Sequence, residues 1–139
     1  MKTYILYAIL AALFASLVPI FGKLGLKDVN STLATAVRAV IMAVFLVAVA
    51  ATTGVLKSVG SIDARSLTLI ALSGLAGALS WLFYFMAVKA GRVPAVVAID
   101  KTSVAIAIFL SWIILGSRMN VKTAVGAVLI VLGAILTAL

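Results

Sequence analysis

The chain has 139 residues, of which 66% are hydrophobic and 10% are charged. Soluble domains average about 45–50% apolar and about 25% charged residues, so this composition excludes an ordinary soluble domain and indicates an integral membrane protein. The net charge is +8, but the basic residues stand singly at the ends of apolar runs, which argues against nucleic-acid binding and favours anchoring at lipid headgroups.

Several residue types that carry chemistry are missing from the sequence. It contains no cysteine, histidine or glutamate. This removes disulfides, thiol chemistry, the usual zinc ligands and the commonest general acids and bases. We therefore expect no enzymatic activity and neither a bound metal nor a cofactor.

Five apolar runs are each long enough to cross a bilayer once, which takes about 20 residues, and too short to cross it twice. The start resembles a secretory leader, but the run over residues 4–22 is too long for a leader and further membrane segments follow it. No run alternates as the strands of a membrane barrel do. We predict an all-α integral membrane protein, with residues 1–139 as one domain and helices at 4–25, 31–54, 67–90, 94–116 and 121–139.

The lysines and arginines divide almost evenly between the two membrane faces. Five spans put the termini on opposite sides, and we call the N-terminal side A and the other side B. Side A carries Lys2, Lys57, Arg65, Arg118 and Lys122. Side B carries Lys23, Lys27, Lys89 and Arg92, with Arg38 and Lys101 further in. Because basic loop residues set orientation, this balance predicts insertion in both directions and an antiparallel homodimer, the alternative being one orientation chosen by subtler signals.

Three charged residues lie deep inside the predicted spans, away from their ends, Arg38 in the second and Asp100 with Lys101 in the fourth. At 1.5 Å per residue they lie about 10 Å below side B, at the depth of Tyr84 in the third span. A charge there costs roughly 2.5–3.5 kcal/mol, so such residues face a bundle interior or a wet cavity and find partners. We predict an Arg38–Asp100 pair. Since successive helical residues are about 100° apart, Asp100 and Lys101 are expected to point in different directions.

Each charged candidate also has a purely structural interpretation. For Lys101 it is snorkelling of the ammonium to the headgroups. For Arg38 and Asp100 it is an ion pair that fixes helix packing. Lys23, near the surface, is either a ligand of the substrate or an interface anchor.

Two kinds of uncharged residue are further candidates. Trp112 fits an interfacial aromatic belt, whereas Trp81 lies more centrally and is a candidate for the substrate path. Gly126 and Gly133 are seven residues apart and share one helix face, which favours a close helix contact, between subunits or within one.

In this order and spacing the features resemble one repeat of the EamA-type drug/metabolite transporters over nearly the whole chain. Residues 21–26 resemble the lysine-bearing end of that family's first helix, and residues 35–38 its arginine early in the second. Residues 77–90 resemble its aromatic-rich third helix. Residues 126–133 are similar to its last helix, which forms a dimer contact in the small multidrug resistance transporters. One departure is Ser117, where the family often has glutamate.

The resemblance implies a small transporter that moves a metabolite or drug-like solute by alternating access as an inverted homodimer. Larger members join two inverted five-helix repeats, so two copies of this chain are expected to rebuild that ten-helix assembly. The implied substrate and coupling residues are Arg38, Tyr84, Asp100, Lys101, Trp81 and Lys23.

The sequence is compatible with more than one coupling mechanism and more than one function. Either Asp100 titrates to couple protons, or the cationic cluster binds an anionic metabolite. Two other interpretations are a subunit of a heteromeric flippase for a lipid-linked substrate and a non-transporting membrane scaffold. The expected partners are the lipid bilayer and a second copy, not nucleic acid, and the expected location is a bacterial or archaeal plasma membrane.

Overall fold

The computed structural model describes residues 2–139, and Met1, the start of the leader-like segment and of the predicted domain, lies outside that range. Within it the chain forms helices and no strand, which confirms the all-α class. Five helical segments are long and apolar enough to cross a membrane, as predicted. They are Thr3–Gly25, Ser31–Thr52, Ala64–Ala90, Val93–Leu115 and Val121–Ala138.

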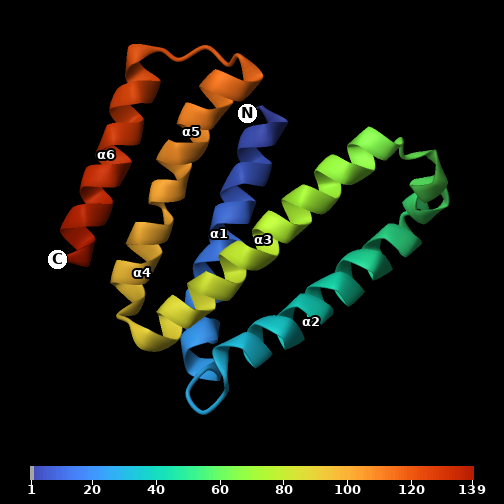
Figure 1. Cartoon of the computed structure of the whole chain (residues 1–139), viewed down its shortest axis with the longest axis horizontal. Helices are drawn as coiled ribbons and strands as arrows, with labels where there is room; N and C mark the ends of the chain where they lie inside the picture. The colour runs from blue at the N-terminus through green and yellow to red at the C-terminus, as the bar shows by residue number, and fades with distance from the viewer. Residues whose placement is uncertain (1) are drawn as a thin grey trace. The chain divides into compact units, whose positions relative to one another are not determined.

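Six α-helices build these spans, and one 3-10 helix lies in the connection between the second and third spans (Figure 1). In chain order they are α1 (Thr3–Gly25), α2 (Ser31–Thr52), η1 (Val55–Ser61), α3 (Ala64–Ala90), α4 (Val93–Asp100), α5 (Thr102–Leu115) and α6 (Val121–Ala138). The chain divides into two compact units. The first unit comprises the described residues up to Lys23 together with Ala90–Leu139, and the second comprises Leu24–Lys89. That all five spans form one domain stays a prediction.

In the first unit, α6 packs along both α4 and α5 (Figure 1). The turn that brings α6 back begins at Gly116, whose φ of 63° is left-handed and therefore suits glycine. The N–H of Ser117 then donates to the carbonyl of Ser111 at 3.2 Å. Asn120 caps α6, because its side chain accepts from the N–H of Thr123 at 2.8 Å.

The fourth span is one crossing, but its helix is interrupted at Lys101, where an unbroken helix over 94–116 is expected from the sequence. The N–H of Lys101 is shared between the carbonyls of Val97 and Ala98. The hydroxyl of Thr102 donates to the carbonyl of Ile99 at 2.7 Å and competes with the backbone for that acceptor. The apolar pattern did not predict this break, because a local change in hydrogen bonding leaves hydrophobic length unchanged.

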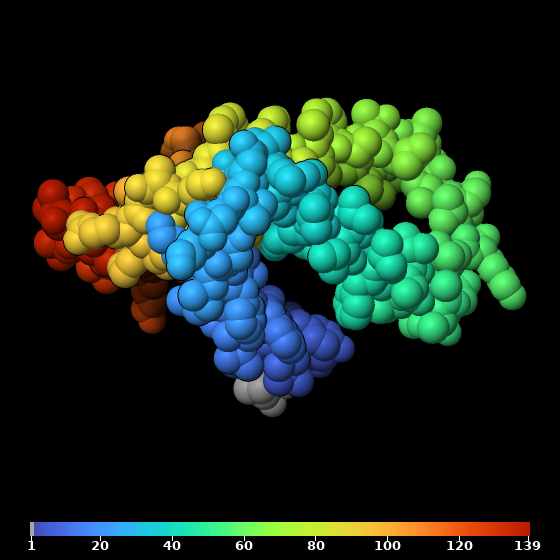
Figure 2. Space-filling view, turned by 90° about the horizontal axis from the view of Figure 1, so that it is seen from below, coloured from blue at the N-terminus to red at the C-terminus, as the bar shows by residue number. Residues whose placement is uncertain are grey.

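In the second unit, α2 and α3 run antiparallel. Asn30 caps α2 by accepting the N–H of Leu33 at 3.3 Å, and Gly54, with φ of 76°, ends the turn that leads into η1. The start of α2 lies against the end of α3, and η1 joins their other ends (Figures 1 and 2). The contact between the two helices is therefore concentrated near side B.

Asp63 precedes α3 and accepts the N–H of Ser66 at 3.0 Å. Hydrogen bonds from Ser66 hold the pKa of the Asp63 carboxyl below its ordinary value. Because the folded pKa is the lower one, this stabilisation is complete above the unfolded pKa of about 3.9 and is lost as pH falls through the folded value.

We expect the difference in melting temperature between wild type and Asp63→Asn to shrink from about pH 6 to about pH 3. Melting curves in detergent measure it, and a difference independent of pH would contradict the assignment.

Three side B cations donate to main-chain carbonyl groups near the ends of helices. The pairs are Lys23 with Gly91 at 3.1 Å, Lys89 with Val29, and Arg92 with Ala138 at 3.1 Å. Gly91 follows α3 and Ala138 ends α6, so two of these cations meet carbonyls at the negative end of a helix dipole. The charges that balance the two membrane faces in the sequence therefore also join segments of the chain within each unit.

Few large side chains are buried in the described chain. The buried apolar residues are Leu26, Phe85, Val88 and Ala134, whereas Phe45 on α2 is 65% exposed and Leu136 on α6 is 74% exposed. Apolar surface of this extent on helices long enough to cross a membrane fits contact with lipid tails. The lipid bilayer is thus the main partner of the outer helix surfaces.

Candidate functional site

Arg38 on α2 lies against an aromatic face of α3. Its guanidinium carbon is 3.7 Å from the centre of the Trp81 ring and 5.3 Å from that of Phe85. Tyr84 packs edge-on against Trp81 at 5.4 Å between ring centres, and against Phe85 at 5.9 Å. We call these four residues, Arg38, Trp81, Tyr84 and Phe85, the Arg38 cluster.

Helical spacing on α3 builds the aromatic side of this cluster. Trp81, Tyr84, Phe85 and Val88 follow the i, i+3, i+4, i+7 pattern of one helix face. Phe85 is 4% exposed and Val88 is fully buried, so this face of α3 is packed against other residues of the protein. Trp81 and Tyr84 were predicted from the sequence. Phe85 was not, although its spacing from Trp81 is the signal that identifies it.

The electrostatics of Arg38 are unusual for a residue inside a span. Within the second unit, neither Asp28 nor Asp63 forms an ion pair with it. A desolvated cation–π contact stabilises by about 2 kcal/mol, against an insertion cost of roughly 2.5–3.5 kcal/mol. The ring faces stabilise the charge but accept no conventional hydrogen bond, so the guanidinium retains the N–H donors that suit a carboxylate or phosphate.

Asp100 and Lys101 form an ion pair where α4 ends, with 3.1 Å between the Lys101 Nζ and the Asp100 Oδ2. The expectation that the two side chains point apart is therefore wrong. The helix is interrupted at this point, and the four-carbon lysine stem is long enough to fold back onto the preceding carboxylate. Because the Lys101 ammonium pairs with Asp100, snorkelling alone does not describe it.

The other predicted site residues have separate surroundings. Lys23 donates to the carbonyl of Gly91, as described above. Arg38 and Asp100 belong to different units, so their direct pairing stays a prediction. A Cβ added at Gly126 or Gly133 meets no atom within 4 Å, which leaves room beside α6 at both positions.

Comparisons with known proteins agree with this membrane architecture. The sequence profile of the EamA-like transporter family matches residues 2–139. A Sinorhizobium protein described as an uncharacterized transporter in the cobO 3'region is 36% identical over 132 residues, which cover 95% of this chain and 94% of that protein. No solved structure matches the chain. With five apolar spans and these two matches, the protein is a multi-pass cell-membrane transporter of the drug/metabolite superfamily, and the chain belongs to the EamA-like transporter family.

Proposed function

We propose that this transporter moves a small anionic metabolite by alternating access, as an inverted homodimer, and that the Arg38 cluster binds the anion. The observation that carries the proposal is the guanidinium 3.7 Å from the Trp81 ring centre with no carboxylate partner in its own unit. A cation at membrane depth without an internal counter-ion is stabilised further when an anionic ligand arrives.

The shape of the cluster favours a particular kind of anion. A guanidinium presents a planar fork that bonds two oxygens of one carboxylate or phosphate. The adjoining rings of Trp81 and Tyr84 offer an apolar surface to the rest of the solute. The best substrate class is therefore a small organic anion with a flat or apolar part, rather than a bare inorganic ion.

The homodimer is supported by the outer surface of the protomer. The even charge distribution favours both orientations, and the open space beside Gly126 and Gly133 leaves a face of α6 on which a second helix can approach closely. In an antiparallel pair, inversion places one Arg38 cluster near each membrane surface. The two protomers then exchange conformations as the cavity between them opens to one side and the other.

Asp100 is the proposed coupling residue. It lies with Lys101 at an interruption of the fourth span, and discontinuous helices of transporters are tolerated where they line a binding site or a wet cavity. Protonation of Asp100 would neutralise its charge and release the Lys101 ammonium from the ion pair. That single step changes the local charge by one and couples proton uptake to the movement of an anion.

Uptake into proteoliposomes tests this function with a panel of labelled anionic, neutral and cationic solutes of matched size. We expect inward proton gradients to drive accumulation of anionic members, and Asp100→Asn to lower that accumulation about tenfold or more while leaving anion exchange intact. Lys101→Gln serves as the comparison, because it removes the ion pair without removing the Asp100 carboxyl. Preference for cationic solutes would overturn the anion proposal, and no uptake of any solute would favour the scaffold interpretation.

A further inference from the structure

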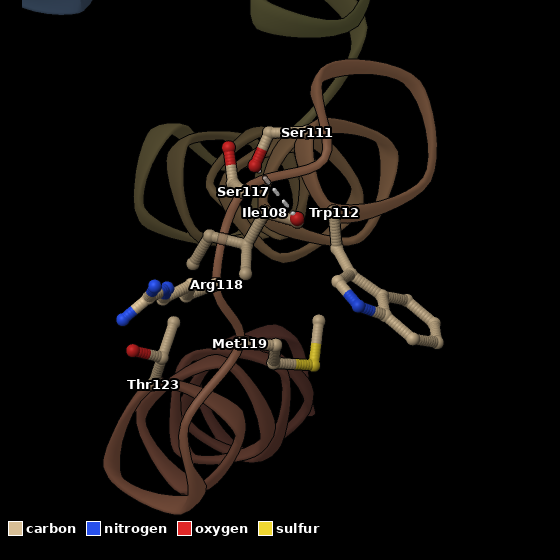
Figure 3. A pocket seen from close by; sticks show the side chains of 7 residues that line it. All are labelled: Ile108, Ser111, Trp112, Ser117, Arg118, Met119 and Thr123. Atoms are coloured by element: carbon tan, nitrogen blue, oxygen red, sulfur yellow. Dashed lines mark hydrogen bonds between the residues drawn. The ribbon is translucent and has the colours of Figure 1, made fainter.

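A pocket of about 230 Å³ lies where the connection between α5 and α6 meets the ends of those helices (Figure 3). It belongs entirely to the first unit and shares no residue with the Arg38 cluster. We propose that this pocket binds the phosphate headgroup of an anionic phospholipid. The inference goes beyond the proposed transport function and does not depend on it.

The lining of the pocket has a polar part and an apolar part. Arg118 and Thr123 lie on one side of it, and Trp112 and Met119 lie on the other (Figure 3). Two of the lining hydroxyls already donate elsewhere, that of Thr123 to the Asn120 side chain at 3.1 Å and that of Ser111 to the carbonyl of Ile108 at 3.0 Å. The donors for a phosphate are therefore the guanidinium of Arg118 and the hydroxyl of Ser117.

Within the described part of the first unit, no carboxylate pairs with Arg118. The aspartate of the first unit, Asp100, is paired with Lys101, and in the described part of this unit Arg118 forms no ion pair. Its neighbour in the pocket is Ser117, which contributes a hydroxyl and no charge. The lining of the pocket therefore carries both a full positive charge and a hydroxyl donor, and each of these groups can bind a phosphate oxygen.

The position of the pocket favours a lipid over a soluble phosphate. It lies at the end of two membrane spans on side A, where phospholipid headgroups are found, and Trp112 is 48% exposed at that level. Ile108, Trp112 and Met119 continue the lining toward the apolar part of α5. A glycerophospholipid fills both parts, because its phosphate meets Arg118 and its first acyl carbons meet the apolar lining, whereas inorganic phosphate leaves the apolar part empty.

Quenching of Trp112 fluorescence by brominated lipids tests the proposal on the full chain. The Trp81→Phe background leaves Trp112 as the sole tryptophan. In phosphatidylcholine vesicles we expect brominated phosphatidylglycerol to quench Trp112 about fivefold more strongly than the same fraction of brominated phosphatidylcholine. Arg118→Gln is expected to bring this ratio to about one.

Matched variants separate a built pocket from general surface charge. Lys122→Gln makes the same charge change on the same side, but Lys122 does not line the pocket, so the fivefold preference should persist. Ser117→Glu keeps the arginine and adds an internal carboxylate, so it should abolish the preference even if Arg118→Gln fails to fold. An equal loss with Lys122→Gln, or an unchanged ratio with Ser117→Glu, would overturn the proposal. Saturable quenching of Trp112 by inorganic phosphate in lipid-free detergent would assign the site to a soluble anion instead.

Discussion

Replacing Arg38 with glutamine is expected to lower uptake of the anionic substrate about 30-fold or more, because removing the charged partner of a desolvated anion costs at least about 2 kcal/mol. Glutamine keeps most of the side-chain length and hydrogen-bonding capacity but removes the charge. The measurement is initial uptake into proteoliposomes at several substrate concentrations. Exposed Arg65 offers the matched control, and Arg65→Gln should leave uptake within about twofold of wild type.

Two further variants separate charge from shape at the same position. Arg38→Lys keeps the charge but loses the planar fork and the stacking on Trp81, so we expect an intermediate loss. Trp81→Leu removes the ring while keeping an apolar side chain, so the substrate concentration at half-maximal uptake should rise. If Arg38→Gln folds, as judged by circular dichroism and gel filtration, and still transports the anion at the wild-type rate, the Arg38 cluster is not the substrate site.

Reporters fused to the C-terminus are expected to give comparable signals from both sides of the membrane, because the charged loops carry almost no orientation bias. Two charge variants should then force the orientation. Ser58→Arg with Val59→Arg adds charge to side A within η1, and Asp28→Arg with Val29→Arg adds it to side B; all four residues are exposed. If each variant places about 95% of the chains in one orientation, random pairing lowers the share of antiparallel dimers from about a half to about a tenth.

Transport should therefore fall about fivefold in each variant alone and return when the two are expressed together. Rescue by co-expression is the decisive measurement, because each charge variant carries the same intact Arg38 cluster. A one-sided reporter signal in the wild type would contradict the proposal that the chain inserts in both orientations and pairs with its own inverted copy. It would favour pairing with a different, oppositely oriented chain, as in a heteromeric flippase. Full activity of a single forced orientation would show that inversion is not needed.

Much of the fold was predictable because its determinants are local. A span needs about 20 apolar residues, and that count can be made without knowing any contact. Asn30 and Asn120 each precede an apolar run and cap a helix through their own side chains. Arg38 and Tyr84 were identified because polar or amphipathic groups at one depth of a membrane protein are expected to meet, and Trp81 because its more central position suits a substrate path.

Other features depend on contacts that hydrophobic length and depth do not encode. Phe85 joins the Arg38 cluster because α3 turns that face toward α2. The interruption at Lys101 follows from shared backbone hydrogen bonds and the hydroxyl of Thr102, in a stretch where Asp100, Thr102 and Ser103 are all weak helix formers. The pocket at Arg118 exists only because the Gly116 turn brings α6 back beside α5.

The residues alone predicted five membrane spans, the charges expected at each face, and the ionisable groups deep within the spans. These are properties of length, hydropathy and position along a helix. The folded structure was needed to show that Arg38 packs on Trp81, that Asp100 pairs with Lys101, and that Arg118 borders a pocket. Helix rotation and the breaks between helices decide which residues a given side chain contacts. Neither changes the apolar length that identifies a span, so hydropathy does not reveal these contacts.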